Sequence, residues 1–359
     1  MRRLPGLLVT IGAALALATA SRAFPVGERH LETTSPTAAL RDADHKPTLR
    51  VTVWYPAADG AQEQSLDIGP PGHTLFYVGE AAPDAPFADD RRRPVILFSH
   101  GYGGTARMMA WFTTVLAQQG FVVVAVDHPG NNGRDKMTVP GAALFWDRAG
   151  DLQAALDAVA ADPVFRGHID VRRLGVAGFA NGGVTALLAA GARADPARFT
   201  AFCAAHPDEG VCKPQPEFPA TLDQQAAALA SPELAAEAAH AGDDRSIRGV
   251  GAVFVMAPAF VQALDPASLA TLAIPAGVIV GEADPVASPR FNGSVVARAM
   301  PRAQIKGLPG VGHYDFVSTC SAEARASLAL CQVAVPQGPT HHDALQMALN
   351  LFAGALGPP

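Results

Sequence analysis

Continuous apolar runs of strand length alternate with helical patterns along most of this chain. Residues 94–99 and 121–126 are two such runs, and residues 108–119 between them have a helical pattern. A strand without polar residues is buried on both faces, which is typical of parallel sheets covered by helices. The sequence therefore predicts an α/β fold with a mostly parallel central sheet flanked by helices. Further strands are expected at residues 49–55, 174–178, 250–256, 276–280 and 303–308, and further helices at 147–161, 185–192 and 344–352.

One segment interrupts this alternation. Residues 203–248 contain two Cys, several Pro and an Ala-rich helical stretch around residues 222–241. Long insertions are often functional, so we expect a small cap over one end of the sheet, and a surface excursion without a role in binding is the alternative. Residues 24–359 are then a single domain, in which residues 69–93, rich in Pro and Asp, are expected to form a loop.

The first 23 residues have the pattern of a secretory signal peptide. Arg2 and Arg3 precede an apolar run at residues 7–18, and small residues suitable for cleavage follow. The run is short for a membrane span, so an uncleaved anchor is the less favoured interpretation. We expect a secreted or periplasmic protein with no stable membrane span in the mature chain.

Charge and cysteine spacing narrow the classes of partner and cofactor. The formal net charge is −6 and no basic run is present, which argues against nucleic acid as a partner. Export permits disulfides, and the simplest pairing joins Cys203 to Cys212 and Cys320 to Cys331. One bridge with two free thiols is the alternative. No C-x-x-C spacing occurs, so zinc or redox chemistry is not expected.

Glycine-rich turns follow two of the predicted strands, at the sheet edge where open α/β sheets bind ligands. Residues 100–104, His-Gly-Tyr-Gly-Gly, would present the backbone N–H of Tyr102 to an oxyanion, and a plain turn is the alternative. Residues 178–183, Gly-Phe-Ala-Asn-Gly-Gly, lie between a strand and a helix, which is the context of the G-x-S-x-G nucleophile elbow. The central residue is Ala180, which has no nucleophilic atom, and the N–H of Asn181 would be a second donor.

Two later turns carry groups suited to acid–base chemistry. Asp284 follows the strand at residues 276–280 and would orient a His; Glu282 competes for this role, and a helix cap is the structural alternative. His313 lies between glycine turns after the last strand, where it would act as a general base. The order elbow, Asp, His is that of the α/β-hydrolases.

These segments resemble the secreted dienelactone-hydrolase-like branch of the α/β-hydrolases, which is related to the platelet-activating-factor acetylhydrolases. The resemblance implies an α/β-hydrolase fold and the hydrolysis of esters or lactones by a Ser or Cys nucleophile. It also implies that Asp284 and His313 are the acid and the base, and that Tyr102 and Asn181 are the oxyanion donors. Position 180 is that of the nucleophile, and there this chain departs from the family. The matching segments are residues 51–56, 94–104, 123–130, 176–183, 279–284 and 312–316.

The residue at position 180 decides the expected activity. Removing the nucleophile of such a triad costs about 10⁶ in kcat, so we expect a carboxylic ester or lactone hydrolase of the Ser-Asp-His type that is nearly inactive with Ala180. Ala180 is then either a substitution introduced into an active enzyme or the native residue of a pseudoenzyme. The alternative function is non-catalytic binding or sensing of acyl or ester ligands.

The expected ligand is a small-molecule ester or acyl compound, and this chemistry requires neither a cofactor nor a metal. Phe179, Trp111 and Tyr314 are apolar candidates for the substrate pocket, although each suits the core equally well. His341, His342 and Asp343 would be a metal cluster by composition only, because adjacent His side chains diverge in a helix. A solvated helix start is the favoured interpretation of these three residues.

Overall fold

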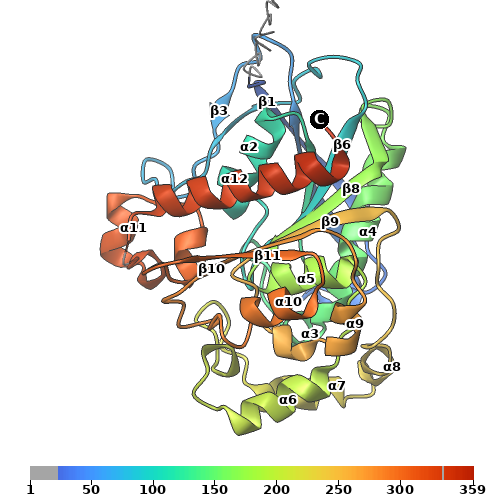
Figure 1. The fold of residues 1–359 in the computed structure, drawn as a ribbon, viewed down its shortest axis with the longest axis vertical. Coiled ribbons are helices and arrows are strands. Elements are labelled where there is room, and N and C mark those ends of the chain that lie inside the picture. The colour runs from blue at the N-terminus through green and yellow to red at the C-terminus, as the bar shows by residue number, and fades with distance from the viewer. Residues whose placement is uncertain (1–22, 334) are drawn as a thin grey trace, which may run out of the picture.

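One large sheet organises the part of the chain that the computed structural model describes, residues 23–333 and 335–359. Its strands are β1 (Val26–Thr34), β2 (Thr48–Pro56), β3 (Gln64–Ser65), β5 (Glu80–Pro83), β6 (Arg93–Ser99), β7 (Val122–Asp127), β8 (Ile169–Phe179), β9 (Val250–Met256), β10 (Ala276–Gly281) and β11 (Ala303–Leu308). They lie in the order β11-β10-β9-β8-β6-β7-β2-β1-β5-β3 (Figure 1). Neighbours from β11 to β7 are parallel, whereas β2 joins β7, and β1 joins β2, in antiparallel register. The predicted, mostly parallel sheet is confirmed.

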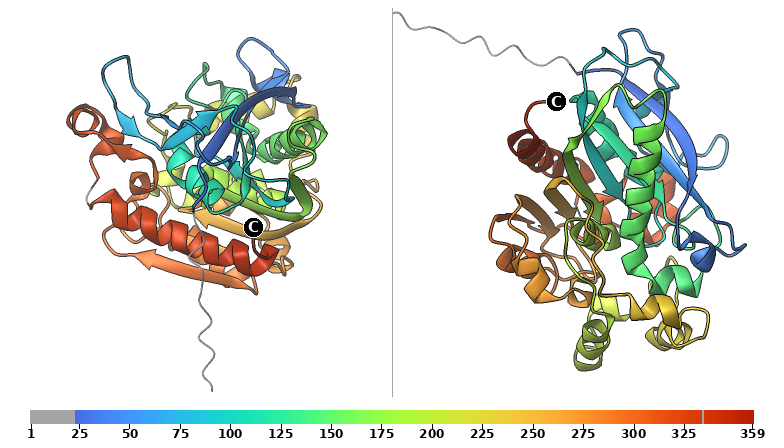
Figure 2. Two further views of the ribbon diagram at one scale, coloured as in Figure 1. Left: turned by 90° about the horizontal axis from the view of Figure 1, so that it is seen from above. Right: turned by 90° about the vertical axis from the view of Figure 1, so that its right-hand side faces the viewer.

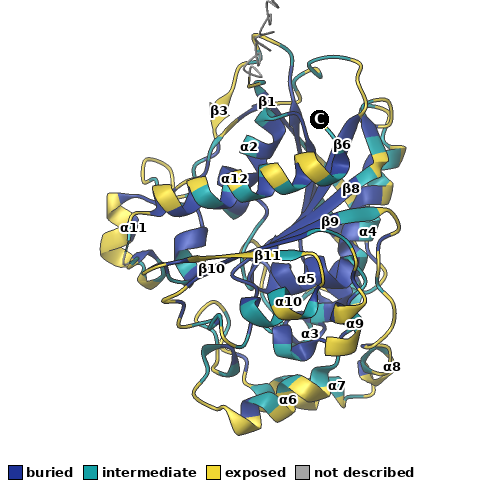
Figure 3. Ribbon diagram, viewed as in Figure 1, coloured by how far each residue is buried: buried dark blue, intermediate teal, exposed yellow. Residues whose placement is uncertain are grey.

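Helices cover both faces of this sheet. On one face lie α2 (Ala110–Gln118) and α12 (Gln337–Leu356); on the other lie α4 (Arg148–Ala161), α5 (Asn181–Ala189) and α10 (Gly293–Ala299) (Figure 2). Strand β6 shows why the apolar runs are continuous. Its residues Val95 and Leu97 pack into one core, and Ile96 and Phe98 pack into the other. The sheet is correspondingly buried throughout its centre (Figure 3).

Shorter elements complete the described chain. The remaining helices are α1 (Ala38–Arg41), α3 (Val139–Ala143), α6 (Pro196–Ala205), α7 (Leu222–Leu229), α8 (Ala235–Ala239), α9 (Pro266–Ala270) and α11 (Ala322–Ser327), and β4 (Phe76–Tyr77) pairs with β12 (Thr319–Cys320) in a small second sheet. We refer to residues 203–248 as the cap segment. It carries α7 and α8 and gathers with α6 beyond the end of the sheet, at the bottom of Figure 1.

Two disulfide bonds link segments of the described chain. Cys203 at the end of α6 is bonded to Cys212, and Cys320 is bonded to Cys331. The predicted pairing is therefore confirmed, and the alternative with two free thiols is wrong, since every Cys of the sequence is paired. The first of these bonds lies within the cap segment and joins the end of α6 to the residues that follow it.

The structure corrects several predicted boundaries. Helix α5 starts at Asn181 instead of residue 185, because tertiary packing overrides the low helix propensity of Gly182 and Gly183. Helix α12 starts at Gln337, seven residues before the predicted start. Within the predicted loop at residues 69–93, β4 and β5 form short strands.

The predicted signal peptide falls almost entirely on residues 1–22, which lie outside the described residues. In the part of the chain that is described, no helix combines the length and apolarity needed to cross a bilayer.

Candidate active site

A strained turn joins β8 to α5 at Ala180. Its backbone has φ 53° and ψ −119°, which L-residues rarely adopt and which costs about 1–3 kcal/mol. Two glycines make this turn possible. A Cβ on Gly178 would lie 1.9 Å from the carbonyl oxygen of Gly182, and a Cβ on Gly182 would lie 2.0 Å from that of Ser99. The segment has the backbone of a nucleophile elbow with a methyl group at its apex.

His313 and Asp284 form a buried hydrogen-bonded pair. The His313 Nδ1–H donates to Asp284 Oδ2 over 2.7 Å, and the two side chains are 5% and 1% exposed. The backbone N–H groups of Val286 and Ala287 each donate to Asp284 Oδ1 over 2.8 Å. Burial alone would raise the pKa of Asp284, but the His313 imidazole and these two N–H groups outweigh burial, so the pKa is lowered from its usual value. Asp284 therefore holds a charged carboxylate against His313.

Glu282 was the competing candidate for the acid. It is exposed, and its side chain lies against Gly307 on β11. Asp284 is the carboxylate that contacts His313. The same Asp284 Oδ1 also accepts from the turn that follows, but the next helix, α10, starts at Gly293 with Asn292 as its N-cap, so the helix-cap interpretation of Asp284 is wrong.

The loop after β6 supplies backbone donors next to the elbow. Neither the N–H of Tyr102 nor that of Asn181 has a hydrogen-bond acceptor among the described residues, and both residues line the cavity at Ala180. The loop itself is held from outside the cavity: the N–H of Gly103 donates to Asn131 Oδ1 over 2.9 Å. A guanidinium group, that of Arg148, donates to the same Asn131 oxygen and to the carbonyl of His100.

A second Ser-His-Asp arrangement lies beneath this loop and was missed from the sequence. The hydroxyl of Ser99 donates to His128 Nε2 over 2.9 Å, and His128 Nδ1–H donates to Asp151 Oδ2 over 2.8 Å. All three residues are fully buried, so no substrate reaches them. Burial and then the neighbouring Arg148 charge lower the pKa of His128 to about 3, so its imidazole is neutral. The arrangement holds the end of β6 in place; its sequence signal was the polar Asp-His pair that ends the apolar run of β7.

A small cavity of about 30 Å³ lies directly at Ala180. Phe179 and Tyr314 line it together with His313, and the Tyr314 hydroxyl donates to Glu217 of the cap segment over 2.8 Å. Trp111 does not line it. Its ring instead stacks on His341 at 3.7 Å, and its Nε1–H donates to the carbonyl of Phe316, which places it in the core.

Two of the three residues at 341–343, His341 and Asp343, have structural partners. His341 Nε2–H donates to the carbonyl of Val317 over 2.9 Å, and Asp343 pairs with Lys306 over 2.9 Å. His341 is thus a buried contact of α12 with the core instead of part of a solvated helix start. Across residues 23–333 and 335–359 no group of three or more metal-ligating side chains is found.

Comparisons with known proteins agree with this geometry. A family model described as serine aminopeptidase, S33, matches residues 90–247, a little under half of the chain. Among solved structures, a ferulic acid esterase from Streptomyces cinnamoneus is similar with a TM-score of 0.61 at 19% sequence identity, over 94% of this chain and 92% of that one. No curated protein matches the sequence. The chain thus has the α/β-hydrolase fold, of the type found in ester hydrolases.

Proposed function

We propose that this chain is built as a secreted carboxylic ester or lactone hydrolase of the Ser-Asp-His type, with Ala180 at the position of the nucleophile. The observation that carries the proposal is the buried His313–Asp284 pair, whose His313 lines the same cavity as the strained elbow at Ala180. Secretion is supported by the N-terminal sequence pattern and by the two disulfides. The branch of dienelactone-hydrolase-like proteins remains the family that the motifs resemble.

The mechanism follows once residue 180 carries a hydroxyl. His313 Nε2 takes the hydroxyl proton as the oxygen attacks the ester carbonyl, and Asp284 stabilises the imidazolium that forms. The N–H groups of Tyr102 and Asn181 hydrogen-bond to the oxyanion. The tetrahedral intermediate then expels the alcohol, which takes the proton from His313. Water, deprotonated by the same imidazole, attacks the acyl-enzyme and releases the acid.

With Ala180 the first of these steps has no attacking atom. The oxyanion donors and binding alone leave roughly 10³–10⁴ of rate enhancement over water, so the chain binds an ester and scarcely hydrolyses it. The second candidate function, non-catalytic binding or sensing of acyl or ester ligands, is favoured by one observation: a methyl group replaces the nucleophile while the surrounding cavity and hydrogen bonds are retained.

The test is the Ala180→Ser variant, assayed with p-nitrophenyl acetate and butyrate beside the parent chain. We expect kcat to rise at least 10³-fold, since the variant restores only the missing oxygen. The double variant Ala180→Ser with His313→Ala is the matched control and should return to the parent rate. If the Ser variant has the same Tm as the parent chain and yet gains no activity, the hydrolase proposal is overturned and the binding function is favoured.

A further inference from the structure

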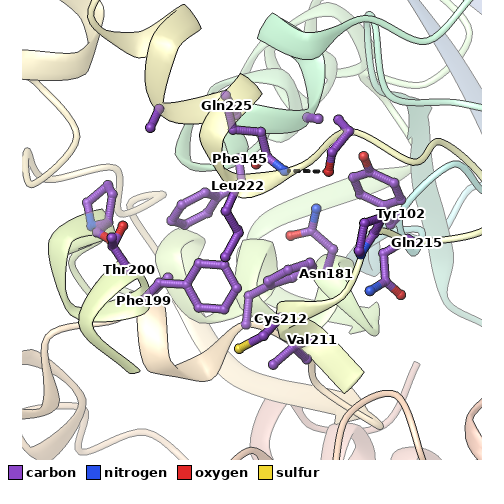
Figure 4. A pocket seen from close by; sticks show the side chains of 18 of the residues that line it. Tyr102, Phe145, Asn181, Phe199, Thr200, Val211, Cys212, Gln215, Leu222 and Gln225 are labelled. Atoms are coloured by element: carbon purple, nitrogen blue, oxygen red, sulfur yellow. Dashed lines mark hydrogen bonds between the residues drawn. The ribbon is translucent and has the colours of Figure 1, made fainter. Parts of the chain in front are cut away.

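A larger cavity lies next to the elbow, between the cap segment and the sheet. Its volume is about 150 Å³. Most of the lining is apolar and comes from segments far apart in the sequence, including α6 and α7 (Figure 4). The principal apolar side chains are those of Phe145, Phe199, Val211, Leu222, Leu229 and Phe260.

This cavity adjoins the site at Ala180. Tyr102, Asn181, Val211, Gln215 and Phe260 line both the small cavity at the elbow and the larger one. A ligand whose ester carbonyl lies between the two backbone donors would therefore have the larger cavity directly beside it. The larger cavity consequently contacts the group attached to the ester, and its shape and chemistry restrict that group.

Volume limits the size of the group. An apolar protein cavity of roughly 150 Å³ accommodates one benzene molecule. The cavity under the cap segment thus fits a single six-membered ring or a chain of about six carbons. Longer chains would have to leave through the opening to solvent.

One buried polar side chain in the lining has no hydrogen-bond partner among the described residues. Asn181 is 1% exposed, and its amide projects from the start of α5 into this cavity (Figure 4). Its Oδ1 is buried without a hydrogen bond, and no described residue contacts its Nδ2 as a hydrogen-bond acceptor. A buried amide without partners is unfavourable, which points to a ligand group that supplies one. A hydroxyl suits this position, since it donates to Oδ1 or accepts from Nδ2.

We propose that the cavity under the cap segment binds a hydroxylated single-ring group, or a hydroxylated chain of about six carbons, that is attached to the ester. In this assignment Asn181 has two separate tasks. Its backbone N–H faces the oxyanion, and its side-chain amide hydrogen-bonds to the hydroxyl of the bound group. The assignment rests on the proposed function, because it takes the elbow as the position of the ester carbonyl.

Binding to the parent chain, with Ala180, tests the assignment without any need for hydrolysis. Calorimetry with phenol and with toluene compares two rings that differ by a hydroxyl. We expect phenol to bind with one site and at least about fivefold more tightly than toluene, because one net hydrogen bond is worth roughly that factor. In Asn181→Leu, which has a similar volume, phenol should lose this advantage and bind no more tightly than toluene, because its buried hydroxyl then has no partner.

Two neighbouring alanines of α7 provide a matched pair of variants. Both are exposed, and of the two only Ala226 lines the cavity. Ala226→Trp should fill the cavity and lower the affinity for phenol at least tenfold, and Ala227→Trp should leave it unchanged. Equal affinities for phenol and toluene in the parent chain, or equal effects of the two Trp variants, would overturn the assignment.

The Ala180→Ser variant separates this assignment from the proposed function. If it is active and phenol inhibits hydrolysis of p-nitrophenyl acetate competitively, both proposals hold. If it is folded and inactive while phenol still binds the parent chain, the hydrolase proposal fails and the cavity remains a ligand site. If it is active and phenol neither binds nor inhibits, only the cavity assignment fails.

Discussion

A methyl group added at Gly182 should force apart the elbow and the loop that carries the first oxyanion donor. The Cβ of Ala at this position would lie 2.0 Å from the carbonyl oxygen and 2.5 Å from the carbonyl carbon of Ser99, and 2.6 Å from the carbonyl oxygen of His100. These are backbone atoms at the end of β6, so no side-chain rotation relieves the overlap. Either α5 or the end of the sheet has to move.

The magnitude follows from that displacement. Ordinary contact requires a separation near 3.4 Å, so Gly182→Ala demands a shift of more than 1 Å in a fully buried region. Overpacking of a rigid core costs about 1–3 kcal/mol and occasionally more, and we expect the upper part of that range. For a chain of this size the loss corresponds to a fall in Tm of roughly 4 °C.

Gly150 provides the matched control, because a Cβ there meets nothing within 4 Å and the residue lies inside α4. Gly150→Ala should stabilise the chain by about 0.5–1 kcal/mol through helix propensity. Urea unfolding and thermal melts of both variants measure the difference. A Gly182→Ala variant as stable as the parent would refute the reasoning, since it would show that the elbow has room to move.

Three further predictions concern single residues of the site and its supports. Ala180→Gly should raise the free energy of unfolding by about 1 kcal/mol, because the relief of roughly 1–3 kcal/mol of backbone strain exceeds the entropic cost of Gly. Urea unfolding measures this change in free energy. Burial raises the pKa of Asp147 to about 7, so its stabilising contribution is complete below the unfolded pKa near 4 and is lost as the pH rises through 7. The free energy of unfolding of the parent chain should therefore fall by up to about 3 kcal/mol between pH 5 and 8 on account of this residue, and Asp147→Asn should abolish that fall. An unchanged pH dependence in Asp147→Asn would contradict this. Arg148→Met should destabilise the chain by about 3 kcal/mol, because the buried carbonyl of His100 loses its donor and Asn131 Oδ1 keeps only the N–H of Gly103. Arg148→Lys should recover part of the loss in the same urea titration.

The sequence predicted those elements whose local pattern matches their environment in the fold. Residues 94–99 are apolar throughout, and β6 is buried on both faces. Strand β1 was missed because Glu28, Arg29 and His30 interrupt its apolar pattern, although its antiparallel pairing with β2 satisfies the backbone. Its place in the sheet is decided by a partner strand, which no local pattern reveals.

In the candidate site, too, local sequence pattern reveals only part of the arrangement. Asp284 and His313 were identified because each follows a strand, and parallel strands bring their carboxyl ends to one edge. The buried pair of His128 and Asp151 was not identified, because Asp151 lies in the first turn of α4 and does not follow a strand. The cavity under the cap segment was equally unpredictable, since its aromatic lining depends on how the cap segment packs.

The central claim is that this site lacks only the nucleophilic oxygen at position 180. Labelling with a fluorophosphonate, followed by mass spectrometry of the peptides, tests it most directly, because phosphonylation requires an activated hydroxyl. The account predicts no label on the parent chain, stoichiometric label on residue 180 in Ala180→Ser, and loss of that label when His313→Ala is added. A folded Ala180→Ser variant that stays unlabelled, or that labels equally well without His313, would contradict the account.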